Sequence, residues 1–131
     1  MKYSLSLIIV LVAIVSCNDV DAPEKDCLET TEMGVRQIVI PDSARVSEPM
    51  HVEVEVVRPD LNTRYVGTIV NKTEFGCEIT IKGEINRCEM GYPAVVYEWH
   101  SFDIIPDKVG TYIVVGIGGY WECIADTTVV F

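Results

Sequence analysis

Residues 28–131 are organised by a two-residue alternation of apolar and polar side chains. In the clearest run, residues 50–57, methionine and valine at the even positions alternate with histidine and glutamate, until Arg58-Pro59-Asp60 ends the pattern. Successive side chains of a strand point to opposite faces, so this period is typical of a strand with one buried face. No helical apolar period and no internal repeat occurs after residue 27, so the sequence predicts an all-β domain.

Similar β-rich runs recur at short intervals and are separated by turn residues. They cover residues 35–40, 50–57, 65–70, 77–81 with a return through 85, 94–105, 111–117 and 127–131. About seven strands at this spacing predict an antiparallel β-sandwich. Residues 28–131 are the size of one domain and too few for two good cores.

The N-terminus has the form of an export signal. Lys2 carries its only charge, and an apolar run over residues 5–15 follows and ends at Ser16-Cys17. A short apolar segment behind a positive charge is typical of a secretory signal, whereas a membrane-spanning helix needs about 20 apolar residues. We therefore expect residues 1–16 to be a cleaved signal peptide.

The boundary Ile14-Val15-Ser16-Cys17 resembles the lipobox of bacterial lipoproteins. The resemblance implies cleavage before Cys17 and fatty acyl chains, such as palmitate, on that residue, which would anchor the protein without a membrane span. The alternative is an ordinary signal peptide with an accidental cysteine.

Residues 17–27 form a polar, acidic segment that we expect to be a solvated tether. Its acidic start resembles the surface-export signal of Bacteroidetes lipoproteins. That resemblance implies a lipid-anchored protein of the outer membrane, facing the periplasm or the cell surface.

Four cysteines remain once Cys17 is assigned to lipid. They are Cys27, Cys77, Cys88 and Cys123. An even number in a small exported domain predicts two disulfides, for which three pairings are possible. A hairpin turn at Lys82-Gly83 would place Cys77 opposite Cys88, so we favour Cys77–Cys88 and, by remainder, Cys27–Cys123.

Two segments resemble the immunoglobulin-like domains of bacterial lipoproteins. One is residues 40–49, which lead into the alternating run, and the other is Asp107-Lys108-Val109-Gly110-Thr111-Tyr112. The resemblance implies an immunoglobulin-like β-sandwich in which Tyr112 forms a tyrosine corner, with its hydroxyl bonded to upstream backbone. Val114 stands where antibody-type domains carry their second inter-sheet cysteine, so that bridge is absent.

Residues for catalysis are scarce in this chain. His51 and His100 are its two histidines, and no nucleophile-elbow, zinc or cofactor motif accompanies either. Alternation places Glu98 and His100 on one strand face, where we expect a surface pair. We predict no enzyme activity, no catalytic residue, no metal site and no cofactor.

Acidic residues dominate the charge, with a net charge of −10. Two pairs, Glu53 with Glu55 and Glu84 with Glu89, could suggest a glycosidase dyad, but solvated faces are the better interpretation because carboxylates are mostly exposed. The excess of negative charge repels the phosphate groups of nucleic acid, so nucleic acid is not an expected partner.

Gly116-Ile117-Gly118-Gly119-Tyr120-Trp121-Glu122-Cys123 is a candidate binding loop, because Tyr120 and Trp121 are residue types that dominate interface energetics. We favour a structural alternative, in which Trp121 caps the end of the sandwich and shields Cys123.

These features favour a membrane-anchored, non-enzymatic binding or accessory module with a protein or glycan partner. An inhibitor of a basic hydrolase such as lysozyme is the alternative, since small acidic exported domains suit its capture. A glycan hydrolase that uses two carboxylates is a third hypothesis.

Overall fold

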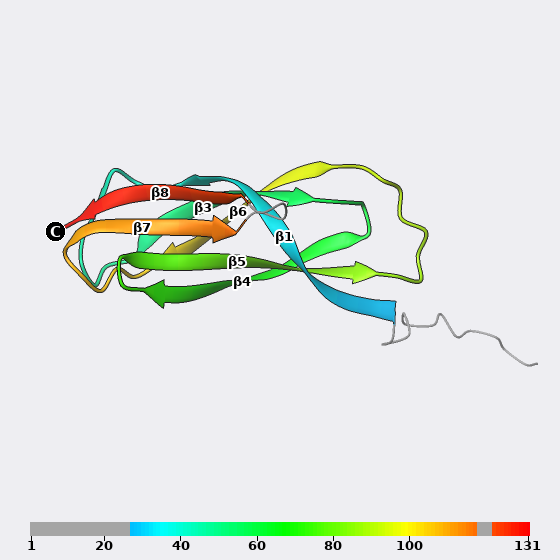
Figure 1. The fold of residues 1–131 in the computed structure, drawn as a ribbon, viewed down its shortest axis with the longest axis horizontal. Coiled ribbons are helices and arrows are strands. Elements are labelled where there is room, and N and C mark those ends of the chain that lie inside the picture. Colours follow the sequence, from blue (N-terminus) through cyan, green and yellow to red (C-terminus); the bar gives the residue numbers. More distant parts are fainter. Residues whose placement is uncertain (1–26, 118–121) are drawn as a thin grey trace, which may run out of the picture.

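Eight strands and no helix make up the part of the chain that the computed structural model describes, residues 27–117 and 122–131 (Figure 1). The strands are β1 (Leu28–Val39), β2 (Ser43–Ala44), β3 (Met50–Arg58), β4 (Thr63–Thr73), β5 (Gly76–Asn86), β6 (Val96–Ile104), β7 (Gly110–Ile117) and β8 (Cys123–Val130). The prediction of an all-β domain is confirmed. The predicted signal peptide, Cys17 and the tether up to residue 26 lie outside the described residues.

Strand β1 joins two layers of one curled sheet. Its first half pairs antiparallel with β5, from Leu28 opposite Asn86 to Met33 opposite Ile81, and its second half pairs antiparallel with β3. One layer is β1–β3–β6, and the other contains β4, β5, β7, β8 and β2. In Figure 1, β1 runs obliquely across the other strands as it changes layer.

Two of the strand pairs are parallel, β5 with β7 and β2 with β8, so the expectation of a purely antiparallel fold is wrong. After β5 the chain crosses to β6 in the other layer and then returns as β7 beside β5. This crossover makes β5 and β7 run in the same direction. Local alternation carries no information on it, because the period of two is the same in parallel and antiparallel strands.

The core lies between the two layers. The even-numbered residues of β3 are buried as the alternation predicts, with Met50 2% exposed and Val52, Val54 and Val56 fully covered. They pack in one cluster with Ile79, Ile81 and Val114 from the second layer and with other buried residues. Each such side chain contributes roughly 1.5–3 kcal/mol of transfer free energy when it leaves water.

Strand β5 is continuous through Gly83, so the predicted turn at Lys82-Gly83 is wrong. Gly83 lies opposite Thr31 of β1 and Tyr65 of β4. A Cβ atom at Gly83 would lie 2.8 Å from Cγ and Sδ of Met33. The glycine therefore leaves room for the buried Met33 side chain of β1 against β5, and it does not mark a change of direction.

The disulfide joins Cys27 to Cys88, with 5.3 Å between their Cα atoms, so both predicted pairings are wrong. Cys77 lies near the start of β5 and Cys88 lies two residues beyond its end. At about 3.4 Å per residue along the strand they are roughly 35 Å apart, far beyond the reach of a bridge. Cys77 is a buried free thiol and Cys123 is an exposed one. A loop of 61 residues closed by the bridge corresponds to roughly 4 kcal/mol in the loop-entropy estimate.

The tyrosine corner expected at Tyr112 is also wrong. Its side chain is 3% exposed, and among the described residues its hydroxyl has no hydrogen-bond partner. Tyr112 lies near Cys77, and burial, reinforced by that thiol, raises the pKa of the Tyr112 phenol well above its usual range. Burial also raises the pKa of the Cys77 thiol. Both groups therefore remain neutral parts of the core.

The thiols give a direct test of the disulfide. Alkylation of the folded protein without reductant should label Cys123 rapidly and Cys77 only after denaturation, because Cys123 is exposed and Cys77 is buried. Peptide mass spectrometry should recover Cys27 linked to Cys88. A Cys27–Cys123 peptide, or rapid labelling of native Cys77, would contradict this structure.

Gly116 offers a test of the packing between layers. A Cβ atom there would lie 2.9 Å from Cγ1 and 3.0 Å from Cβ of Val35, a stiff β-branched side chain, whereas Gly67 has nothing within 4 Å. Gly116→Ala should cost about 1–3 kcal/mol of unfolding free energy. At roughly 4–8 °C per kcal/mol this lowers Tm by about 5–20 °C.

Gly67→Ala is the matched control for that experiment, since it makes the same substitution in open space. It should leave Tm unchanged or raise it slightly, because alanine restricts the unfolded chain. Equal effects of the two substitutions in thermal unfolding would rule out the tight contact at Gly116.

Candidate functional site

Strand β6 carries distinctive side chains on both of its faces. In the described part of the chain it pairs only with β3, so it forms an edge of the sheet. Glu98 lies opposite the buried Val56, and His100 lies opposite the buried Val54, which puts both on the inner face. Tyr97 and Trp99 therefore point outward.

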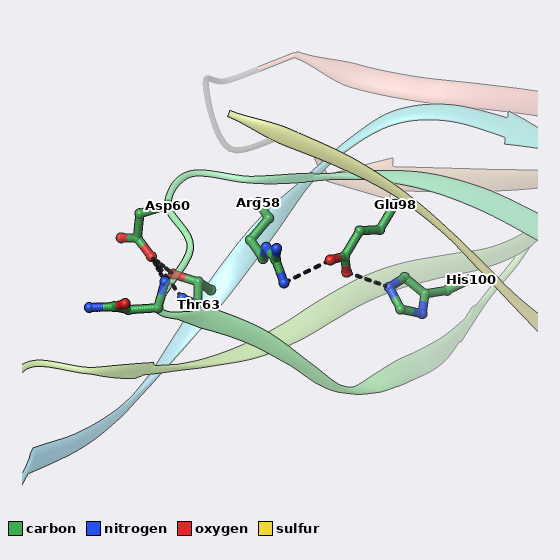
Figure 2. A network of polar contacts seen from close by, with 6 residues as sticks. Arg58, Asp60, Thr63, Glu98 and His100 are labelled. Carbon is green, nitrogen blue, oxygen red and sulfur yellow. Dashed lines mark hydrogen bonds and ion pairs between the residues drawn. The ribbon is translucent and has the colours of Figure 1, made fainter. Parts of the chain in front are cut away.

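The inner face of β6 holds a short polar network, drawn in Figure 2. Arg58 Nη1 lies 2.8 Å from Glu98 Oε1, and His100 Nε2 lies 3.3 Å from Glu98 Oε2. The Tyr65 ring of β4 stacks on the His100 ring with centroids 3.8 Å apart and 19° between the planes. The network thus links β3, β6 and β4 across the edge of the two layers.

The prediction that Glu98 and His100 form a surface pair is therefore only partly correct. The two residues share a face, but that face points inward, and their side chains are only 27% and 22% exposed. Alternation assigns residues to the same face without deciding which face is buried. Burial of the pair is tolerated because the Arg58 guanidinium compensates the Glu98 carboxylate.

This network connects three strands and lacks the arrangement of a nucleophilic catalytic centre. Among the described residues, the polar partner of His100 is Glu98, and no hydroxyl or thiol nucleophile is bonded to its ring. Nucleophilic catalysis needs a nucleophile within hydrogen-bond reach of its base. In Figure 2 the neighbouring turn is held separately by Asp60, whose Oδ1 accepts bonds from the Thr63 backbone N–H at 2.7 Å and hydroxyl at 2.8 Å.

The outer face of the β1–β3–β6 layer carries the more promising feature. Tyr97 is 51% exposed and Trp99 is 52% exposed. Trp99 lies opposite Glu55 of β3 in the strand register. The Arg36 guanidinium of β1 lies 4.4 Å from the Tyr97 ring centroid, and its Nη1 lies 3.5 Å from Glu55 Oε2. We call these four residues, Arg36, Glu55, Tyr97 and Trp99, the aromatic face.

A β-bulge places Arg36 in this group. The β1–β3 register shifts between Val35 and Gln37, and Arg36 is the extra residue. A bulge re-aims a side chain relative to the regular alternation. Arg36 thereby reaches over β3 to Tyr97 on β6, while its carboxylate partner Glu55 is only 13% exposed.

The far end of the same outer face is polar. His51 Nδ1 and Asp103 Oδ1 lie 3.1 Å apart, and both side chains are about 60% exposed. Exposed pairs of this kind contribute little to stability. His51 and Asp103 lie on the same outer face as Tyr97 and Trp99, toward the other end of β6, and make that end polar.

A groove of about 480 Å³ lies on the open side of the fold, where Val70 and Lys72 of β4 approach Ile104 and Tyr112. The Lys72 ammonium donates a hydrogen bond to Asp107, at 3.1 Å, and lowers the pKa of that carboxyl. Tyr112 is the aromatic residue of its lining and is only 3% exposed, so the half-exposed rings of the aromatic face are the better candidate for binding.

The structure separates most of the residues that the sequence singled out. The candidate loop residues Tyr120 and Trp121 lie outside the described residues, and Gly116 is a buried member of β7 rather than part of a loop. Glu84 is paired with Arg64, and because β5 has no turn it does not flank a hairpin with Glu89. Across residues 27–117 and 122–131, no cluster of His, Cys, Asp or Glu could hold a metal ion, and no helix could cross a membrane.

Sequence reasoning missed Tyr97 and Trp99 as a candidate site. Their alternation with Glu98 and His100 was a usable signal, because it places two aromatic side chains on one face with Ser101 and Asp103. The contribution of Arg36 had no such signal, since it depends on the bulge.

Comparisons with known proteins do not assign the chain to a family. No protein-family model matches it, and no curated protein or solved structure is significantly similar to it.

Proposed function

We propose that this chain is an extracytoplasmic lipoprotein whose domain is a non-enzymatic binding module, and that the aromatic face is its recognition surface. The single observation that carries the proposal is the pair of half-exposed rings, Tyr97 and Trp99, beside the Arg36–Glu55 ion pair. Tyrosine, tryptophan and arginine are the residue types that contribute most to binding energy at interfaces.

The aromatic face is suited to binding because it is built on strands. Arg36 is held between the Tyr97 ring and Glu55, and the two rings stand on β6, which pairs with β3 along its whole length. Groups that are already ordered lose less conformational entropy when a ligand arrives. Sites on regular elements are also held more precisely than sites on loops.

Anchoring through Cys17 fits the position of the disulfide. The Cys27–Cys88 bridge ties the first described residue to the segment after β5. A tether over residues 18–26 would therefore enter a covalently fixed end of the domain. In this proposal the lipid holds the module at the outer membrane, facing the periplasm or the cell surface, as the lipobox and the acidic segment suggest.

We also propose a specific kind of β-sandwich for this domain. We infer a variant of the immunoglobulin-like sandwich, supported by the two packed layers with alternating inward residues. The parallel β5–β7 pair is a departure from the antiparallel form that the sequence resemblance implied.

The acidic charge supports one second candidate, an inhibitor of a basic hydrolase such as lysozyme. A net charge of −10 would accelerate encounter with a cationic enzyme, in a manner that salt suppresses. Such capture need not involve the aromatic face, which allows the two candidates to be separated.

Anchoring is tested by Cys17→Ala. The variant should lose incorporation of labelled palmitate, because its side chain has no sulfur to carry the thioether, while the unaltered protein should accumulate as a precursor under globomycin. Labelling followed by gel electrophoresis measures both effects. Continued palmitate incorporation in Cys17→Ala would reject the lipobox assignment.

The recognition surface is tested by the double variant Tyr97→Ala/Trp99→Ala. We expect its affinity for any bound member of a panel of soluble polysaccharides and exported proteins to fall by about 30-fold, the size of a typical hot-spot loss. Biolayer interferometry on the immobilised protein measures the change. The matched control is Phe75→Ala/Tyr92→Ala, which removes two exposed rings elsewhere and should bind as the unaltered protein does.

Two results would count against the aromatic face. Equal binding by the double variant and the unaltered protein would exclude it as the recognition surface. Lysozyme capture that survives in the double variant but disappears at high salt would favour the inhibitor instead.

A further inference from the structure

The aromatic face combines an indole ring with a neighbouring ion pair. Trp99 is half-exposed, and Glu55 lies opposite it on the adjacent strand. Tyr97 is partly covered by the Arg36 guanidinium, so Trp99 offers the freer ring. The ligand must therefore present an apolar surface to the indole and hydrogen-bonding groups to the ion pair.

From this combination we infer that the aromatic face binds neutral glycans, with the Trp99 indole stacked on a sugar ring and Arg36 and Glu55 bonded to its hydroxyls. This inference rests on the proposed function, whose ligand class it names. A pyranose ring has C–H groups on its faces and hydroxyls around its rim, which matches an aromatic ring beside polar groups.

The polar groups on the face have hydrogen-bonding capacity to spare. Arg36 is 56% exposed, has five N–H donors and reaches Glu55 through Nη1, while Glu55, 13% exposed, uses one of its two oxygens in that contact. Neighbouring hydroxyls of a sugar act as both donors and acceptors, so one pair of them can satisfy the carboxylate and the guanidinium together. Bonds to ionised groups are about twice as strong as bonds between neutral groups.

A protein partner fits the aromatic face less well. The cores of protein interfaces are depleted of glutamate, yet here Glu55 lies opposite Trp99 and is paired with Arg36 beside the Tyr97 ring. Covering that pair with apolar protein surface would remove water from both charges. Their mutual attraction offsets this desolvation energy only when the geometry of the pair is excellent. Sugar hydroxyls replace the lost water contacts.

The charge of the face selects neutral sugars over acidic ones. Besides Glu55, the same outer face carries Glu53 and Asp103, against Arg36 as its cation next to the rings. Carboxylates or sulfates on a ligand would be repelled by this acidic excess. The preferred ligand is therefore a glycan without ionised groups.

The experiment uses the exported full chain with Trp121→Phe. The chain has two tryptophans, so this background leaves Trp99 as the sole indole reporter. The probes are a neutral β-glucan, a mannan and a xylan, then polygalacturonate as the acidic glycan and lysozyme as the protein. We expect at least one neutral glycan to shift Trp99 emission to shorter wavelength and to retard the unaltered protein in affinity electrophoresis, with no response to polygalacturonate.

Variants identify the groups responsible. Trp99→Ala should weaken retardation by the neutral glycan about 30-fold, and Glu55→Gln, which keeps the side-chain shape, about tenfold. Tyr92→Ala is the control, an exposed ring outside the face that should change nothing. If Trp99→Ala fails to fold by circular dichroism, Glu55→Gln in the unaltered background decides the same question.

The outcomes separate this inference from the proposed function. Absence of any response to the three neutral glycans overturns the inference, as does retardation that is unchanged in both Trp99→Ala and Glu55→Gln. If lysozyme alone is bound and Tyr97→Ala/Trp99→Ala abolishes that binding, the recognition surface stands and the glycan assignment fails. If the double variant retains all binding, both fail.

Discussion

The change of partner along β1 is the constraint on which the rest of the structure depends. One strand bonds to β5 over its first half and to β3 over its second, so β1 is hydrogen-bonded to both layers and joins them. The inner faces are thereby held against each other, and the β3 valines are covered by the β5 isoleucines and Val114. Side chains of β1 pack closely on Gly83 of β5 and on Gly116 of β7, where a Cβ atom would lie within 3.0 Å of Met33 and of Val35.

The same strand explains the covalent and the surface features. Its first residues bring Cys27 to the end of β5, where Cys88 is available, and this leaves Cys77 in the core and Cys123 at the surface. Its bulge lies where β1 has just joined β3, and that irregularity turns Arg36 toward Tyr97. The aromatic face is thus a consequence of how β1 changes layer.

Strand β6 has different environments on its two sides. Inward, the ionic compensation of Glu98 by Arg58 and the stacking of Tyr65 on His100 close the edge of the sandwich. Outward, Tyr97 and Trp99 are left half-exposed beside charged neighbours. The partly buried network with paired charges stabilises β6, the strand that carries Tyr97 and Trp99. It thereby fixes the position of the proposed binding surface.

The sequence by itself determined the all-β class, the buried face of β3 and most strand positions, because alternation and turn residues act within a few neighbouring residues. Tertiary structure alone decided the parallel β5–β7 pair, the Cys27–Cys88 bridge, the inward direction of Glu98 and His100, and the meeting of Arg36 with Tyr97. Each of these joins segments far apart in the chain. Such pairings depend on how whole layers pack, which a local pattern does not encode.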